Sequence, residues 1–207
     1  MIILVEEPFR TQQEIDIKNV FTELDPSIPL VCVCGNHDVG EFPTRESIKR
    51  YTDHFGDDYF DFYCSGVHCI VLNSQFYVDA THVEDLKREH EKWLDEVLQD
   101  KQSKHILIFQ HVPWFLNEPN EDKDYFNVEI NARLEMLEKF SKAGVKKIFC
   151  GHCHRNAGGF YKSIEEIVTS AIGLSLGEQK SGLRLVRVTE DDITHQYFET
   201  ENIPTTF

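Results

Sequence analysis

The chain has 207 residues, 41% of them hydrophobic, which is enough apolar material for one well-packed domain. Its formal charge is −15, from 21 basic and 36 acidic side chains. A surface this negative disfavours nucleic acid and anionic membranes as partners, because proteins bind both largely through attraction to phosphate groups.

The first part of the chain predicts two helices with a strand between them. Residues 11–24 have apolar side chains at roughly helical spacing. Residues 28–34 form a short apolar run rich in β-branched side chains, which is typical of a buried strand. Thr44 can cap a second helix, which would end at Gly56.

The rest of the chain alternates between strands and helices and then becomes rich in strands. A hairpin is expected around Ser65-Gly66, and Gly144 is expected to end a later helix. The expected strands are residues 59–63, 67–73, 105–110, 147–150, 183–188 and 193–198, and the expected helices are residues 83–98 and 130–143. This order predicts a layered α/β fold in which residues 1–207 form one domain.

Neither a secretory leader nor a disulfide framework is expected. The apolar run at residues 2–5 is too short for a signal peptide, and no run approaches the roughly 18 residues that a membrane helix needs. Four of the six cysteines lie within apolar runs, as buried reduced thiols do: Cys32, Cys34, Cys69 and Cys150. We therefore expect a cytoplasmic protein, and no pattern indicates its oligomeric state.

Polar side chains follow three of the expected strands. Residues 28–34 are followed by Asn36 and His37, residues 105–110 by His111, and residues 147–150 by His152 and His154. If the strands are parallel, these side chains converge at one edge of the sheet, where ligands bind in open α/β folds. A single histidine at a strand end is more often a satisfied core or surface residue, but five polar side chains at three strand ends favour a shared site.

Imidazole and amide groups are suitable ligands for a divalent metal ion. His152 and His154 lie two residues apart, so in extended backbone they would point the same way and Cys153 the opposite way. Imidazole nitrogens suit zinc, iron or manganese, and an amide oxygen can complete such a site. Asp38, which follows His37, could be a turn or capping residue as readily as a part of the site.

The three motifs together resemble the calcineurin-like metallophosphoesterases. The resemblance rests on Gly35-Asn36-His37-Asp38, the single His111 and Gly151-His152-Cys153-His154. It implies a metallophosphoesterase-like α/β/β/α sandwich and a centre with two divalent ions, manganese, iron or zinc. Asn36, His111 and His152 would bind the second ion and His154 the first. His37, held by Asp38, would donate a proton to the leaving group.

The chemistry of phosphate esters fits that assignment. A phosphomonoester dianion repels hydroxide, and a pair of metal ions both neutralises it and acidifies a water molecule. The leaving oxygen then needs a proton, which a histidine can supply near neutral pH. Arg155 could hold a phosphate oxygen with its planar group of donors, although a surface arginine is the simpler interpretation. The resemblance implies a phosphoprotein carrying phosphoserine or phosphothreonine, but a small phosphomonoester fits the residues equally well.

Two further motifs of this family, Asp-x-His and Gly-Asp-x-x-Asp, are not found before Gly35. We therefore expect an N-terminally incomplete domain that lacks its N-terminal strands and has impaired phosphatase activity. The main alternative is a catalytically inactive fragment that binds a metal or a partner in a regulatory role. A structural zinc site built from Cys32, Cys34, Cys150 and Cys153 is a weaker alternative, and a nuclease conflicts with the charge.

Overall fold

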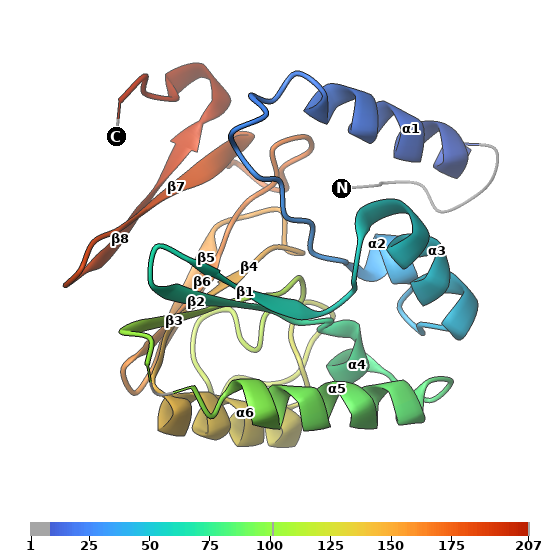
Figure 1. Cartoon of the computed structure of the whole chain (residues 1–207), viewed down its shortest axis with the longest axis vertical. Coiled ribbons are helices and arrows are strands. Elements are labelled where there is room, and N and C mark those ends of the chain that lie inside the picture. Colours follow the sequence, from blue (N-terminus) through green and yellow to red (C-terminus); the bar gives the residue numbers. More distant parts are fainter. Residues whose placement is uncertain (1–8, 101, 207) are drawn as a thin grey trace.

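The computed structural model describes residues 9–100 and 102–206, so the apolar run at residues 2–5 lies outside the described residues. Its main feature is a six-stranded sheet in the order β1-β2-β3-β4-β6-β5 (Figure 1). The strands are β1 (Phe60–Cys64), β2 (Val67–Val71), β3 (His105–Phe109), β4 (Val145–Cys150), β5 (Ala157–Tyr161) and β6 (Ile164–Val168). The four central strands run parallel, and β1 and β5 pair antiparallel at the two edges.

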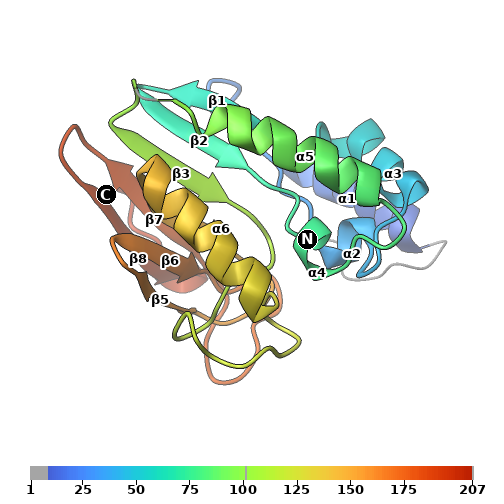
Figure 2. The ribbon, with the colours of Figure 1, turned by 90° about the horizontal axis from the view of Figure 1, so that it is seen from below.

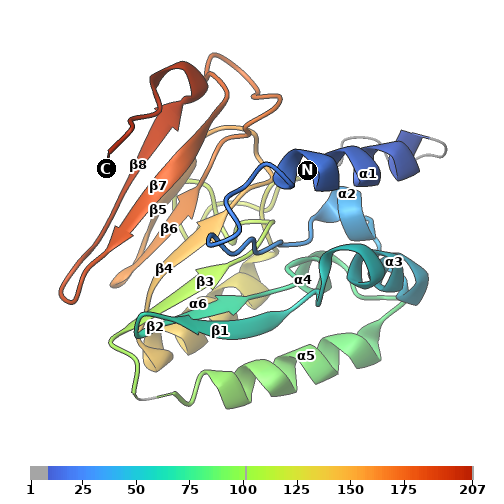
Figure 3. The same cartoon turned by 45° about the horizontal axis from the view of Figure 1, so that its top comes forward.

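Helices cover one face of this sheet and a two-stranded sheet covers the other. Two long helices pack side by side on the first face, as Figure 2 shows from below: α5 (Glu84–Val97) and α6 (Ile130–Ala143). The antiparallel pair β7 (Gly182–Val188) and β8 (Ile193–Glu199) lies against the second face (Figure 3). The shorter helices are α1 (Phe9–Phe21), α2 (Asn36–Val39), α3 (Arg45–Phe55), α4 (Gln75–Val78) and the 3-10 turn η1 (Thr200–Asn202).

Alternation of side chains along the strands produces the two buried layers. In β3, Ile106 and Ile108 belong to the core beneath α5 and α6, whereas Leu107 belongs to the core that contacts Ile193 of β8. This period of two is what a strand with both faces covered requires. The predicted layered α/β class is therefore confirmed. Among the described residues, no helix is both long and apolar enough to cross a membrane.

Most of the predicted elements are confirmed, with ends that shift by a few residues. Thr44 caps α3 by accepting a hydrogen bond from the Ser47 backbone N–H, and the helix ends at Gly56, which has a positive φ of 95°. The hairpin turn at Ser65-Gly66 and the end of α6 at Gly144 are also as expected. Strands β5 and β6 were not predicted individually, because β5 has two consecutive glycines and β6 carries a buried glutamate, Glu166.

The prediction of a strand at residues 28–34 is wrong. These residues form irregular backbone that leads into α2, and Ile28, Leu30 and Val31 are exposed. In the described part of the chain no strand pairs with this segment, so its backbone groups have no ladder to join. An apolar run alone therefore does not make a strand.

Helix α1 confirms the helix predicted at residues 11–24 but ends at Phe21, and its apolar side chains do not form its buried face. Ile15 and Val20 are exposed, whereas Glu14 is buried. Glu14 accepts hydrogen bonds from Arg10 (3.1 Å) and from Arg50 of α3 (2.9 Å), so an ion-pair cluster fixes this helix to its neighbour. Desolvation is the largest single influence on the pKa of Glu14, and it raises that pKa. The two guanidinium groups together outweigh it, so the pKa is lowered.

His90 of α5 makes folding stability depend on pH. It is fully buried among the rings of Tyr59, Phe76, Tyr77 and Trp93, and desolvation lowers its pKa from 6.5 to about 3. Because the unfolded chain binds a proton here below pH 6.5 and the folded chain does not, this group's stabilising effect is lost as pH falls from about 6.5 towards 3.

We expect His90→Leu to flatten the pH dependence of the unfolding free energy between pH 4 and pH 6 by up to about 1.4 kcal/mol per pH unit, the value for one proton. Urea unfolding of both proteins at pH 4, 5 and 6 measures this slope. Equal slopes in the two proteins would contradict the role assigned to His90.

Candidate metal centre

His111 and His152 meet because β3 and β4 are parallel neighbours in register. Phe109 lies beside Phe149, and the ladder continues beyond both strands, where Gly151 donates its backbone N–H to the His111 carbonyl (3.0 Å). The two imidazole rings consequently lie 5.0 Å apart, centroid to centroid. This part of the predicted convergence is seen in the structure.

Asn36 reaches the same place from the first turn of α2 and not from a strand end. Its Oδ1 lies 2.9 Å from Nε2 of His111. The preceding glycine, Gly35, allows this approach, because a Cβ at that position would lie 2.7 Å from the His111 ring. Three segments far apart in the chain therefore place one amide and two imidazoles together.

The route by which His152 and His154 reach this region differs from the prediction. Both have left-handed backbone, with φ of 68° and 50°, in a turn where Cys153 donates its N–H to the Gly151 carbonyl (2.8 Å). The expected extended geometry is therefore wrong, because the chain turns directly after β4. Cys153 is nevertheless fully buried, and both histidines are partly exposed.

Desolvation keeps the paired imidazoles neutral. It lowers the pKa of His111 from 6.5 to about 3, and the neighbouring histidines contribute smaller effects in the same direction. Desolvation also lowers the pKa of His152, partly opposed by a hydrogen bond to the Tyr125 carbonyl. A neutral imidazole presents a lone pair, which is the form that binds a metal ion.

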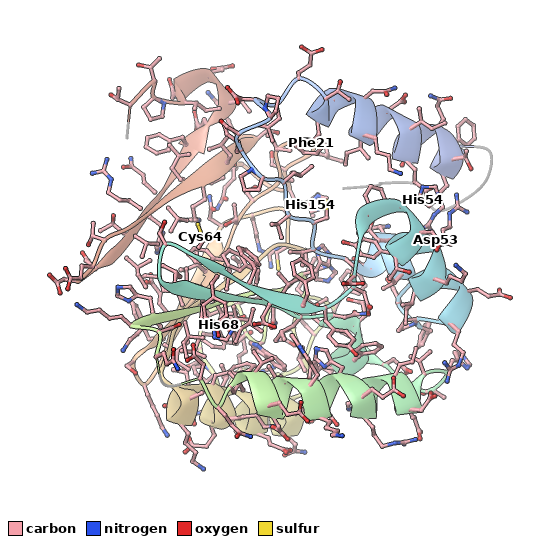
Figure 4. The ribbon with its side chains drawn as sticks, in the orientation of Figure 1. Phe21, Asp53, His54, Cys64, His68 and His154 are labelled. Atoms are coloured by element: carbon pink, nitrogen blue, oxygen red, sulfur yellow. The ribbon has the colours of Figure 1, made fainter. Side chains whose placement is uncertain are left out.

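His154, Asp38, His111 and His152 line one cavity of about 500 Å³. Its other walls are largely apolar and come from α1, α3, residues 30–33 and residues 169–171. In Figure 4 His154 lies below Phe21 of α1, and both residues line this cavity. These four members of the predicted site therefore lie in one region. Asn36, another member, lines a second, smaller cavity, which His152 also lines.

His37 and Asp38 lie in α2, directly after Asn36. His37 is close enough to His111 and His152 to lower their pKa values by charge repulsion. Asp38 accepts a hydrogen bond from the Gly35 N–H (2.9 Å), so its carboxylate caps the helix. This is the capping role that the sequence also allowed for Asp38. Desolvation raises the pKa of Asp38, while this hydrogen bond and nearby cations oppose the rise.

Arg155 packs against an aromatic ring, and the cysteines of the predicted zinc site are divided between two core clusters. The Arg155 guanidinium lies over the ring of Phe126, 4.8 Å from its centroid, which is a cation–π contact. Cys34 packs in a different core cluster from Cys150 and Cys153, and all six cysteines are free. A four-cysteine zinc site is therefore ruled out by the packing.

The donor set fits one divalent ion better than two. Ligands about 2.1 Å from a common ion lie about 3.0–3.4 Å apart in octahedral or tetrahedral geometry, close to the Asn36–His111 separation of 2.9 Å. Within residues 9–100 and 102–206, however, no group of three or more His, Cys, Asp or Glu side chains is arranged to hold a metal ion. The amide of Asn36 is thus needed as third donor, and for a second ion the predicted set leaves only His154.

Gly35→Ala tests the approach of α2 to His111 without removing a donor. The added methyl group would overlap the imidazole, so we expect Mn²⁺ affinity to fall at least about tenfold and stability by about 1–3 kcal/mol. Gly151→Ala is the matched control, because its Cβ would lie 3.5 Å from Nδ1 of His111, an ordinary contact. Metal titrations that give the same affinity for both variants would contradict the geometry.

Comparison with known proteins decides the family. The sequence profile of the calcineurin-like phosphoesterases matches residues 8–156 of the chain. The chain belongs to the calcineurin-like phosphoesterase family. Membership in this family implies divalent metal ions.

Members of this phosphoesterase family that resemble the chain include serine/threonine-protein phosphatase CPPED1 from several vertebrates. The Danio rerio protein is 45% identical over 199 residues, which is 95% of this chain and 64% of that protein. The Homo sapiens protein is 44% identical over 201 residues, with the same coverage of both chains. This chain thus spans 64% of the length of these relatives.

A solved dimetal phosphatase from Danio rerio shares the calcineurin-like fold. It superposes with a TM-score of 0.53 at 17% identity and covers 78% of this chain and 67% of its own. At this identity the match supports the fold alone, and it agrees with the sheet and flanking layers described above.

Proposed function

We propose that the chain is a metal-dependent phosphomonoester hydrolase whose substrates are phosphoserine or phosphothreonine in proteins. The observation that carries the proposal is the meeting of Asn36, His111 and His152 from three separate segments. The name of the CPPED1 relatives as serine/threonine-protein phosphatases supports the substrate class. Six free cysteines support a reducing, cytoplasmic setting.

Three residues would hold the ion in this proposal. A divalent ion in such a site polarises phosphoryl oxygens and lowers the pKa of a coordinated water. Asn36 would offer its amide oxygen, and His111 and His152 would offer ring nitrogens that desolvation keeps unprotonated. Since His152 Nε2 lies 3.2 Å from the Tyr125 carbonyl, Nδ1 is the nitrogen left for a metal.

His37 would act on the leaving group. It precedes Asp38 in α2, adjacent to the donor triad, and its imidazole can deliver a proton to the departing alkoxide of serine or threonine. Asp38 would support this by fixing the helix turn that presents His37, through its hydrogen bond to Gly35. Arg155, which follows His154 and lies over the ring of Phe126, would hold a phosphate oxygen.

The second candidate is a metal-binding module with weak or no turnover. The donor set within the described residues suits one ion, and hydrolysis by this chemistry generally uses two. On that account the chain would bind about one Mn²⁺ per molecule and would hydrolyse phosphomonoesters slowly.

Turnover and metal content of His37→Gln test the proposal. We expect hydrolysis of p-nitrophenyl phosphate and of a phosphoserine peptide to fall by about 10²–10⁴-fold, the usual contribution of a general acid, with metal content unchanged. His82→Gln, at an exposed position, is the matched control. Loss of the ion from His37→Gln would make His37 a ligand, and a metal-loaded wild-type chain without turnover would favour the second candidate.

A further inference from the structure

We infer that Tyr125 and Glu41 form a positioning pair that sets which atom of Asn36 faces the metal centre. This inference rests on the proposed function, because it assigns Asn36 a metal-binding oxygen. It concerns two residues in loops that none of the sequence motifs includes.

A chain of hydrogen bonds connects these residues to the donors. The Tyr125 hydroxyl donates to Oε1 of Glu41 (2.8 Å) and accepts from Nδ2 of Asn36 (3.2 Å). On its other side, Oδ1 of Asn36 lies 2.9 Å from Nε2 of His111. Asn36 itself is buried, so its amide has few other partners available.

The polarity of this chain determines the orientation of the amide. A carboxylate accepts hydrogen bonds and cannot donate them, so the single proton of the Tyr125 hydroxyl is directed to Glu41. The hydroxyl oxygen is then an acceptor towards Asn36, and only the amide NH₂ can satisfy it. The amide oxygen must consequently point the other way, towards His111, where a metal ligand is required.

Tyr125 also contacts a second donor. Its backbone carbonyl lies 3.2 Å from Nε2 of His152, and its ring lies 5.1 Å from the His152 ring. Asn36, Glu41, Tyr125 and His152 line one cavity of about 190 Å³. One loop residue therefore contacts two of the three donors of the centre, as partners outside a metal's direct ligands commonly do.

The test compares Tyr125→Phe with Tyr63→Phe. The first variant removes the hydroxyl and keeps the ring and the backbone carbonyl. The second is a matched control, because Tyr63 is similarly exposed and its hydroxyl also donates to a carboxylate, that of Asp100 (3.4 Å). Titration with Mn²⁺, followed by the paramagnetic resonance of the free ion, gives the affinities.

We expect Tyr125→Phe to weaken Mn²⁺ binding about tenfold and Tyr63→Phe to leave it unchanged. Glu41→Gln should weaken it by about threefold, because glutamine can donate to the hydroxyl and so permits the reversed amide. In the metal-free protein, the side-chain amide signals of Asn36 in a ¹H–¹⁵N spectrum should shift in Tyr125→Phe and stay in place in Tyr63→Phe.

Unchanged Asn36 amide signals in Tyr125→Phe would overturn the inference, whatever the affinities are. A shifted amide with unchanged Mn²⁺ affinity would overturn it as well, because orientation would then have no effect on the metal. A wild-type chain that binds no Mn²⁺ would instead refute the proposed function, and the amide spectra would still decide whether Tyr125 orients Asn36.

Discussion

Replacing His111 by alanine is expected to weaken Mn²⁺ binding by about 100-fold or more. The imidazole lies 2.9 Å from Asn36 Oδ1 and 5.0 Å from the His152 ring, so it is the donor that connects the other two. Loss of a supporting partner outside the ligand shell already reduces metal affinity about 10–100-fold, and loss of a ligand should reduce it further. Metal titration of the purified variant measures the change.

The control for His111→Ala is His82→Gln, which changes an exposed histidine near the end of α4. We expect this variant to bind Mn²⁺ as the wild type does. Circular dichroism should show that both variants remain folded. An affinity within threefold of the wild type in His111→Ala would show that the ion binds somewhere else.

Replacing Arg133 by methionine is expected to destabilise the fold by about 3–5 kcal/mol. This arginine of α6 is fully buried, and its guanidinium donates four hydrogen bonds to carbonyls of one loop: Val128 (3.1 and 2.7 Å), Pro119 (3.0 Å) and Glu121 (2.7 Å). Methionine has similar length and helix propensity, so the loss would come from the unsatisfied carbonyls. Urea unfolding measures the difference.

Arg88→Met in α5 is the matched control, because Arg88 is exposed and lies 3.7 Å from Glu84. Arg88→Met should change the free energy of unfolding by no more than about 0.5 kcal/mol. A loss of less than 1 kcal/mol in Arg133→Met would contradict the anchoring role. The anchored loop carries Tyr125, so a weaker metal affinity in this variant is also expected.

Much of the fold and of the donor set could be predicted from local patterns. Helix α6 was predicted to its residue bounds, because its apolar spacing, its length and the glycine that follows all agree. The meeting of His111 and His152 followed from parallel strands, whose carboxyl ends share an edge. In both cases the information lies within one short segment or in the general geometry of a sheet.

The features that were not predicted depend on contacts between distant segments. Residues 28–34 have the composition of a strand, but a strand exists only where another one pairs with it. Tyr125 follows the acidic run at residues 118–124, in which Glu121 accepts hydrogen bonds from the backbone of Leu116 and Asn117 and so organises the loop. No spacing in the sequence connects Tyr125 with Asn36, which lies 89 positions earlier.

Anomalous X-ray diffraction from a crystal of the chain grown with Mn²⁺ tests the central claim most directly. The account predicts a manganese peak about 2.0–2.3 Å from the Asn36 amide oxygen and from one ring nitrogen each of His111 and His152. A peak bound by other residues, with these three side chains directed away from it, would contradict the account.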